Sequence, residues 1–274
     1  MNVETWSGKD RGDENFPVGS RLIRRALRPH VHAFYAFARN ADDIADSADL
    51  EAADKVARLD VMEDVLLGRS DAGAPSALAL RASLAATGVT ARHSCDLLVA
   101  FRRDAIKRRY ANWAELYDYC RFSAMPVGRH VLDLHGEDAA THVPSDALCV
   151  SLQILNHLQD GAKDLATLDR CYLPVDMLTR HGASVDDLRA TSASPALRGV
   201  FNVLLGEVET LNRAAGELPR RTRDRRLRLE TAVIVGLARR LERRLRTGDP
   251  VAGRVALSKM DAGASLLASL RLLT

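Results

Sequence analysis

The chain of 274 residues lacks the features of a membrane-spanning or secreted protein. No window reaches the roughly 20 uninterrupted apolar residues that a membrane-spanning helix needs. The most apolar stretch, VALSKMDAGASLLASLRLLT, is interrupted by Lys259, Asp261 and Arg271. The N-terminus, MNVETWSGKDRGDENFP, has no apolar core of the kind found in signal peptides. The sequence therefore predicts neither a membrane span nor secretion, and we expect a cytoplasmic location.

Cysteines and aromatic residues are scarce. The four cysteines form no CxxC pair and no cluster with histidine, which indicates reduced thiols rather than a zinc site or a disulfide framework. Aromatic residues make up only 5% of the chain while apolar residues reach 47%, and no long glycine- or proline-rich tract occurs. This composition favours a helical globular protein. The cysteines are Cys95, Cys120, Cys149 and Cys171.

Hydrophobic residues recur at helical spacing along the chain, and the alternation typical of strands is missing. The breaks are short and contain glycine or proline, with no internal repeat. We therefore predict an all-α fold in a single domain, 1–274, with residues 1–13 as a flexible N-terminal extension. A helix that begins near Pro29 should run through residue 46. Further helices are predicted at about 51–68, 76–87, 91–109, 113–134, 145–166, 195–217, 222–246 and 252–272.

Three aspartates stand directly behind an apolar helical pattern in the stretch FYAFARNADDIADSADL. At 100° per residue, Asp42 and Asp46 continue the apolar stripe of this helix and lie about 6 Å apart along its axis. Two neighbouring buried anions are costly unless a cation or hydrogen-bond donors neutralise them. The pattern predicts that this helix presents a carboxylate pair to a cation. The predicted inward stripe comprises Val31, Tyr35, Ala38, Asp42 and Asp46.

A second polar ladder lies in SLQILNHLQDGAKDLATLDRCYLP, residues 151–174. Asn156, Asp160 and Asp164 are spaced i, i+4, i+8, while the helix is apolar on nearly every other side, which is typical of a central helix. Two ladders of hard oxygen ligands suit Mg²⁺, and if they face each other they would hold a diphosphate through bridging ions. One Asp-x-x-x-Asp pair is usually a solvated helix face. Two such ladders in apolar sequence favour a metal site.

With these two motifs the chain resembles the squalene and phytoene synthase family, over about residues 14–245. Within this family, the resemblance is greatest to the branch whose members form hydroxysqualene in bacterial hopanoid pathways. The segments that carry this resemblance are ENFPVGS, RPHVHAFYAFARNADDIAD, YCRFSAMPVGRHVL and NHLQDGAKDLATLDRCYLP. The resemblance implies a helical isoprenoid-synthase bundle with a central cavity for diphosphate and two or three Mg²⁺ ions. It also implies conversion of presqualene diphosphate to hydroxysqualene, with water capturing the final carbocation. A partner enzyme of the family would supply presqualene diphosphate from two farnesyl diphosphates.

The family's functional residues can be carried over by position. Arg39, one turn before the first motif, would contact diphosphate, and Arg170 and Tyr172 would lie near the phosphates. Asp43 belongs to the first motif but points elsewhere on the helix. The implied metal ligands are Asp42, Asp43, Asp46, Asn156, Asp160 and Asp164. The aromatic residues that could line a dry channel around the cation, or simply pack in the core, are Phe16, Phe34, Tyr35 and Phe122.

Two positions depart from the family pattern. Arg121 stands where the family has a tyrosine that is proposed to assist proton removal, and Tyr117 and Tyr119 flank it. Asn15, before Phe16, replaces a serine that often touches phosphate. The first departure argues against cyclopropane formation from farnesyl diphosphate. It suggests that Arg121 acts near the diphosphate or the captured water, with a helix-surface arginine as the alternative.

Residues 220–246 hold eleven arginines against three acids. Leucines at helical spacing indicate that one face packs inward, so a solvated arginine face is the simplest interpretation. Peripheral contact with anionic lipid at the inner membrane surface is the second, because a C30 product must enter a bilayer. A nucleic-acid partner is not expected, since it leaves the buried carboxylates unexplained. No GxGxxG motif follows a strand pattern, so no nicotinamide cofactor is expected either.

Two alternative functions remain open. The chain could condense two prenyl diphosphates as a presqualene diphosphate, squalene or phytoene synthase. It could also be a catalytically silent relative that serves as an assembly or scaffold protein. A silent relative would be expected to lose metal ligands, and both ladders are complete here.

Overall fold

The computed structural model describes residues 2–4 and 22–270. In these residues the regular secondary structure is helical, with only an isolated bridge between Arg109 and Cys171, which confirms the predicted all-α class. The contacts divide the chain into two compact units. Unit 1 comprises residues 1–106 and 126–138, and unit 2 comprises residues 107–125 and 139–274. That the whole chain is one domain stays a prediction.

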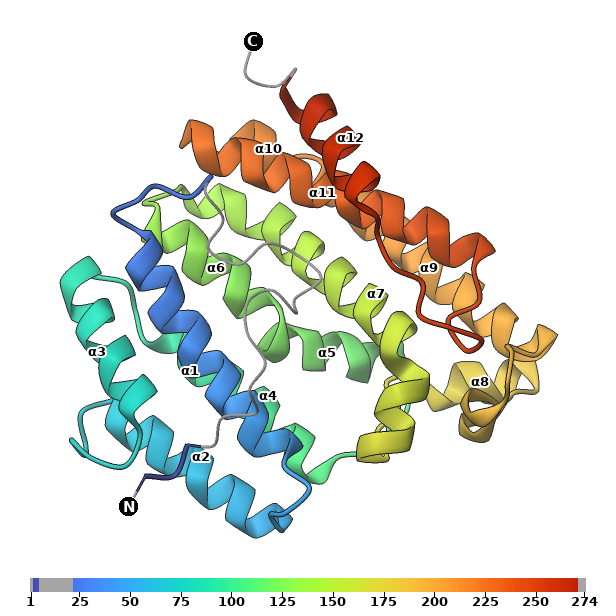
Figure 1. Ribbon diagram of the computed structural model, residues 1–274, viewed down its shortest axis with the longest axis horizontal. Helices are drawn as coiled ribbons and strands as arrows, with labels where there is room; N and C mark the ends of the chain where they lie inside the picture. The colour runs from blue at the N-terminus through green and yellow to red at the C-terminus, as the bar shows by residue number, and fades with distance from the viewer. Residues whose placement is uncertain (1, 5–21, 271–274) are drawn as a thin grey trace. The chain divides into compact units, whose positions relative to one another are not determined.

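Unit 1 is built around α1 (Arg28–Asp46), which packs against α2 (Ala52–Leu66), α3 (Pro75–Thr87) and α4 (Arg92–Ile106) (Figure 1). α6 (Met125–Leu134) also belongs to this unit, except for its first residue. Pro29 lies in the first turn of α1, where its missing N–H removes no helical hydrogen bond. The core of unit 1 is formed mainly by aliphatic side chains together with Met62, Phe34 and Phe37, and Phe37 has no exposed surface.

The stripe that the sequence predicts as the inward face of α1 is not its most buried one. The fully buried stripe contains Phe37, Ala41 and Ile44, whereas Asp42 and Asp46 lie on a half-buried face together with Tyr35 and Ala38. The predicted inward stripe is thus only partly buried, with Val31 as its most buried member, because α1 is apolar on two adjoining faces and helical period alone does not rank them. The more apolar face packs in the core of unit 1.

Residues 2–4 are held against unit 1 although they fall in the predicted flexible extension. The amide of Val3 donates to the carbonyl of Gly73 at 2.8 Å. The carboxylate of Glu4 accepts from the amide and the hydroxyl of Ser76, at 2.8 and 2.6 Å. Glu4 thus satisfies a free N–H in the first turn of α3, as a capping residue does. The rest of the extension lies outside the described residues.

Unit 2 contains α5 (Trp113–Ser123), α7 (His142–Leu168), α8 (Val175–His181), α9 (Pro195–Ala215), α10 (Leu218–Arg221), α11 (Arg225–Thr247) and α12 (Lys259–Leu270), with short 3₁₀ turns at Ala139–Thr141 and Val185–Arg189. α7 packs against α5, α9 and α11, so the prediction that it is a central helix is confirmed. No helix of the described residues combines the length and the apolar character needed to cross a bilayer.

Three features of the helices differ from the sequence prediction. The predicted helix 113–134 is two helices that meet at Ala124, and Pro126 occupies the second position of α6. A break there is expected because proline has no N–H for a continuous helix. The predicted helix 252–272 begins only at Lys259. The preceding residues 249–258 form an irregular segment held to α7 by a hydrogen bond from the Gln159 amide to the carbonyl of Val255. α8 was not predicted.

Candidate active site

The first aspartate motif is organised by Arg39. Its guanidinium contacts Asp42 Oδ2 at 2.9 Å and Asp43 Oδ1 at 2.7 Å, three and four residues further along α1. These spacings place the two carboxylates on the turn that follows the arginine. The side chain of Asp43 is only 4% exposed, so its ion pair with Arg39 is buried within unit 1.

Asp42 is more accessible than Asp43, and its surroundings disfavour the charged form of its carboxyl group. Its side chain is 35% exposed, yet burial by the surrounding protein raises the pKa of its carboxyl to about 8. The neighbouring Asp46 carboxylate adds to this rise, and Arg39 opposes it. Burial and the neighbouring acids thus outweigh the effect of Arg39 on the pKa of Asp42. Closely spaced carboxylate oxygens are hard donors of the kind that Mg²⁺ prefers.

The second motif lies on α7 in unit 2. Asn156, Asp160 and Asp164 are all half-buried and follow one another at successive turns, as the spacing predicts. The carboxylate of Asp160 pairs with Arg254 Nε at 3.1 Å. Arg254 belongs to the irregular segment before α12, so that segment reaches the second motif directly. No local sequence pattern indicates this pair, because the two residues are 94 positions apart.

The metal site itself stays a prediction. Within residues 2–4 and 22–270, no three His, Cys, Asp or Glu side chains converge on one metal position. The predicted ligands are divided between unit 1 and unit 2 and include the amide of Asn156. Their oxygen donors match the preference of Mg²⁺, which completes its coordination with water and phosphate oxygens.

An aromatic cluster stands beside the second motif. The ring of Tyr172 stacks on His157 with centroids 3.6 Å apart and lies 5.5 Å from the rings of Tyr110 and Tyr119. Arg170 is buried and donates to the Tyr172 hydroxyl at 3.3 Å. Burial, assisted by the charge of Arg170, lowers the pKa of His157 to about 3, so this imidazole is neutral near pH 7.

The structure thus brings the predicted residues Tyr119, Arg170 and Tyr172 together. His157 and Tyr110 are partners of this cluster that the sequence analysis missed. The position of His157 between Asn156 and Asp160 was a usable signal, whereas nothing near Tyr110 in the sequence indicated it.

Arg121 and its neighbours lie elsewhere on α5. The side chain of Arg121 is 60% exposed and pairs with Asp118 at 3.2 Å, which favours the alternative of a helix-surface arginine. Phe122 is half-buried, with the Arg121 guanidinium 6.0 Å from its ring. Tyr117 packs against Trp113, and partial burial raises the pKa of its hydroxyl. A catalytic role for Tyr117 or Arg121 stays a prediction.

The aromatic candidates of unit 1 differ in environment. Phe34 is buried and stacks on His130 at 3.8 Å between centroids, whereas Tyr35 is half-buried. His130 is almost fully buried, and neither of its ring nitrogens has a hydrogen-bond partner among the described residues. Asn15 and Phe16 lie outside the described residues.

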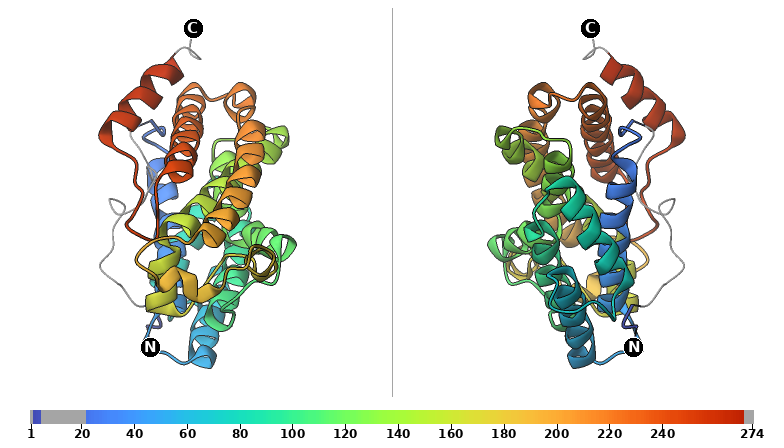
Figure 2. Two further views of the ribbon diagram at one scale, coloured as in Figure 1. Left: turned by 90° about the vertical axis from the view of Figure 1, so that its right-hand side faces the viewer. Right: turned by 90° about the vertical axis from the view of Figure 1, so that its left-hand side faces the viewer.

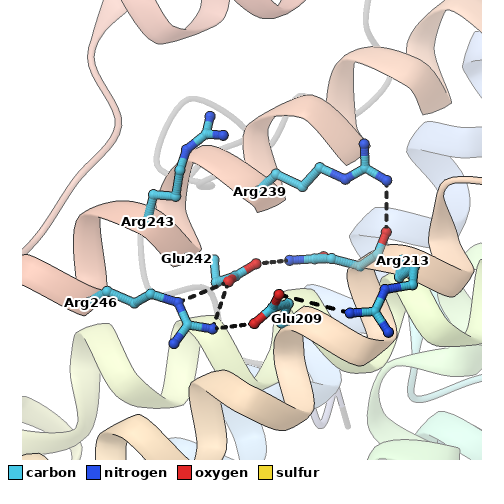
Figure 3. Close-up of a pocket in the computed structure, with 7 residues that line it drawn as sticks. Glu209, Arg213, Arg239, Glu242, Arg243 and Arg246 are labelled. Atoms are coloured by element: carbon cyan, nitrogen blue, oxygen red, sulfur yellow. Dashed lines mark hydrogen bonds and ion pairs between the residues drawn. The ribbon is translucent and has the colours of Figure 1, made fainter.

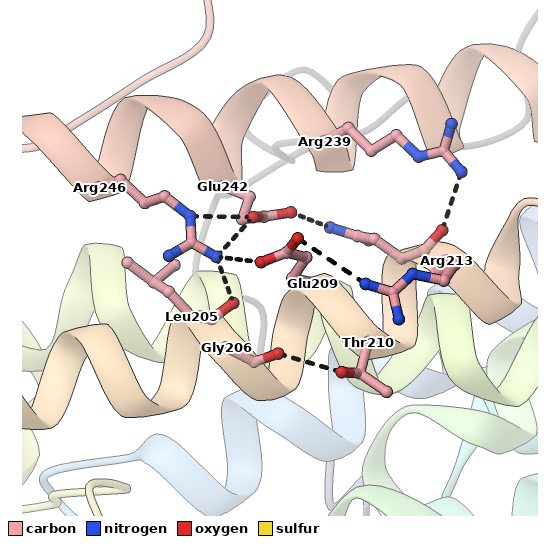
Figure 4. A network of polar contacts seen from close by, with 9 residues as sticks. Leu205, Gly206, Glu209, Thr210, Arg213, Arg239, Glu242 and Arg246 are labelled. Carbon is pink, nitrogen blue, oxygen red and sulfur yellow. Dashed lines mark hydrogen bonds and ion pairs between the residues drawn. The ribbon is translucent and has the colours of Figure 1, made fainter.

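A cavity of about 410 Å³ lies between α9 and α11, and no residue of either aspartate motif lines it (Figure 3). Arg246 pairs there with Glu209 at 2.9 Å and with Glu242 at 3.0 Å, and Asn212 donates to Glu242 at 2.9 Å (Figure 4). This network neutralises the two glutamates. The lining residues are Glu209, Asn212, Arg213, Arg239, Glu242, Arg243 and Arg246.

The family model described as squalene/phytoene synthase matches residues 9–261. The chain belongs to the squalene/phytoene synthase family. A relative from Rhodopseudomonas palustris named hydroxysqualene synthase is 47% identical over 94% of this chain and 88% of its own length. A relative of the same name from Sinorhizobium fredii is 45% identical over 91% of this chain and 85% of its own. A phytoene synthase of Thermus thermophilus is 30% identical over 72% and 68%.

Solved structures agree with this assignment. The squalene synthase HpnC of Alicyclobacillus acidocaldarius superposes with a TM-score of 0.75 at 33% identity, covering 86% of this chain and 89% of that one. A dehydrosqualene synthase superposes with a TM-score of 0.82 over 95% and 92%. Its sequence identity of 23% supports the fold alone. The predicted isoprenoid-synthase bundle is confirmed.

Proposed function

We propose that the protein ionises presqualene diphosphate and directs water to the resulting carbocation, which yields hydroxysqualene and diphosphate. The observation that carries this proposal is the pair of complete oxygen-ligand motifs on α1 and α7 in a chain 47% identical to a hydroxysqualene synthase. The enzyme class follows from the family, whose members process prenyl diphosphates.

The side chains that would hold Mg²⁺ are Asp42, Asp46, Asn156, Asp160 and Asp164. When bound, two or three Mg²⁺ ions would supply the positive charge that stabilises a departing diphosphate. Arg39 is already oriented by Asp42 and Asp43 and would add a guanidinium to the same task. The buried position of Asp43 supports a role in positioning Arg39 rather than in binding metal.

The aromatic cluster of unit 2 fits the second requirement of the reaction, a surface that does not quench the cation early. Tyrosine faces attract a cation without forming a bond to it. A neutral His157, stacked flat on Tyr172, exposes no positive charge to repel the cation. Arg170 and Tyr172 would in addition lie near the phosphates.

Incubation with Mg²⁺ and either presqualene diphosphate or farnesyl diphosphate, with and without a nicotinamide, tests the proposal. We expect hydroxysqualene from presqualene diphosphate, independent of nicotinamide. Product from farnesyl diphosphate alone would support the alternative of a condensing synthase. Failure to convert either substrate, with Mg²⁺ present, would favour a catalytically silent relative.

The proposal also implies partners and a location. A presqualene diphosphate synthase must supply the substrate, and we place the protein in the cytoplasm with peripheral contact at the inner membrane surface. The basic α11 supports such contact, because exposed arginines attract anionic lipid. Nothing in the proposal requires nucleic acid.

A further inference from the structure

The terminal helix α12 buries its polar face and exposes its apolar face. Its polar residues Asp261, Ser265 and Ser269, spaced i, i+4, i+8, are buried against α11. Its apolar side chains are on the outside, which is unusual because exposed leucines normally turn toward the protein. The exposed fractions are 84% for Met260, 41% for Leu266, 69% for Leu267 and 43% for Leu270.

The orientation of α12 is fixed by specific contacts. Arg244 of α11 pairs with Asp261 at 2.7 Å, and Arg240 donates from Nε to the Ser265 hydroxyl at 3.1 Å. Ser258 caps the helix by accepting from the Asp261 amide at 3.2 Å, and its own amide and hydroxyl donate to the Asp261 carboxylate, both at 2.7 Å. These hydrogen bonds and the charge of Arg244 lower the pKa of Asp261, so the pair with Arg244 is ionised near pH 7.

A close backbone approach supports the same orientation. A Cβ added to Gly236 of α11 would lie 3.2 Å from the Cβ and the hydroxyl of Ser265. Gly236 therefore leaves the space that the small side chain of α12 fills. Rotating α12 to bury its leucines would place Leu266 or Leu267 against Gly236, Arg240 and Arg244. The outward apolar face is thus a consequence of what α11 presents.

Basic residues lie at the start of α12 and on the neighbouring helix α11. Lys259 at the start of α12 and Arg243 of α11 are exposed and have no polar partner among the described residues. Within the part of the chain that the structure describes, Arg239 donates only to the backbone carbonyl of Asn212. By helical period, Arg243 lies between the line of α11 that faces α12 and the line that faces α9. Figure 2 shows α12 beside α11 and away from α9 in both views.

We propose that the apolar face of α12 and the adjacent basic residues Lys259, Arg239 and Arg243 form a docking surface for an anionic lipid bilayer. Aliphatic side chains on one helix face, flanked by cations, enter the boundary between headgroups and acyl chains. The surface deepens the membrane contact proposed above by naming the helix that makes it.

Charge decides between the bilayer and a second copy of the chain. A twofold contact through α12 would bring identical surfaces together. The basic residues of one chain would then lie near the same basic residues of the other chain. Like charges so close are repulsive, whereas anionic headgroups complement them. The bilayer is therefore the occupant that the observations favour.

Co-sedimentation of the full chain with vesicles tests this surface. We expect binding to vesicles that contain phosphatidylglycerol and little binding to pure phosphatidylcholine. The double variant Met260→Glu/Leu267→Glu should reduce the bound fraction by about tenfold or more, because it removes the largest apolar contacts. Arg243→Ala should weaken binding mainly at low salt. Val143→Glu, which alters an equally exposed apolar residue on α7, should bind as the wild type does.

Several outcomes would overturn the inference. The inference is overturned if the wild-type protein does not bind anionic vesicles. It is also overturned if the double variant binds them as well as the wild type does. Sedimentation velocity without vesicles provides another test: a wild-type dimer that the double variant converts to a monomer would show that a second copy covers this face. Vesicle binding needs no substrate. A protein that binds vesicles but converts no presqualene diphosphate in detergent would refute the proposed function and leave the docking surface intact.

Discussion

His130 on α6 couples the stability of unit 1 to pH. Its ring is 1% exposed and stacks on Phe34, and burial, helped by nearby His93, lowers its pKa from 6.5 to about 3. In the unfolded chain the ring is in water and has its ordinary pKa of about 6.5. Between these two pH values the unfolded chain takes up a proton that the native protein does not. The free energy of unfolding must therefore fall as the pH falls from 6.5 toward 3.

The size of this effect follows from the shift. Each pH unit below the unfolded pKa costs about 1.4 kcal/mol per group, so acidification from pH 7 to about pH 5 should cost about 2 kcal/mol through this ring. His130→Leu removes the titration. The loss of unfolding free energy between these pH values should then be about 2 kcal/mol smaller in the variant than in the wild type. The comparison of pH slopes cancels any constant packing cost of the substitution.

Urea unfolding followed by circular dichroism at each pH measures both slopes. Leu132→Ala on the same helix is a matched control, since it also removes a buried side chain but no titrating group. It should be destabilised at every pH and keep the wild-type slope. If His130→Leu and wild type lose the same free energy, within about 0.5 kcal/mol, the ring accepts a proton in the native state and the reasoning is wrong.

Three further predictions concern the candidate active site. Asp42→Asn and Asp160→Asn should each lower turnover of presqualene diphosphate by at least about a hundredfold with unchanged circular dichroism, whereas Asp118→Asn on the exposed side of α5 should not. Arg254→Gln should tighten Mg²⁺ binding to the substrate-free protein by up to about fivefold in calorimetry, because it removes a cation that competes for Asp160; weaker binding would contradict this role. Arg121→Tyr should leave the ratio of alcohol to hydrocarbon products unchanged if Arg121 is a surface residue, and an altered ratio would place it at the reaction.

Local spacing was sufficient to predict much of this molecule. The intervals of four residues correctly placed Asn156, Asp160 and Asp164 along one face of α7, and the apolar surroundings correctly identified a central helix. On α1 the same reasoning grouped Asp42 with Asp46 but did not identify which of two adjoining apolar faces is the more buried. Two adjoining apolar stripes differ only in what they pack against, and that information is tertiary.

Contacts between distant parts of the chain could not be predicted. The pair of Arg254 with Asp160 and the stack of His157 on Tyr172 each join residues that no helical period relates. The reversed orientation of α12 has the same origin. Its own sequence favours buried leucines, and α11 overrides that preference through the pair of Arg244 with Asp261 of α12 and the close approach of Gly236 to Ser265.

The two arginines at the aspartate motifs differ in how firmly they are held. Arg39 shares a helix with its partners and its side chain is only 12% exposed, so its contacts with Asp42 and Asp43 are built into α1. Arg254 reaches Asp160 from an irregular segment and its side chain is 51% exposed, a situation in which an ion pair contributes at most about 1 kcal/mol. Asp160 can therefore exchange its arginine for another cation at little cost, whereas Asp43 cannot. Aspartates of the two motifs thus suit different roles. The surroundings of Asp160 support a role as a metal ligand, and those of Asp43 support a role in positioning Arg39.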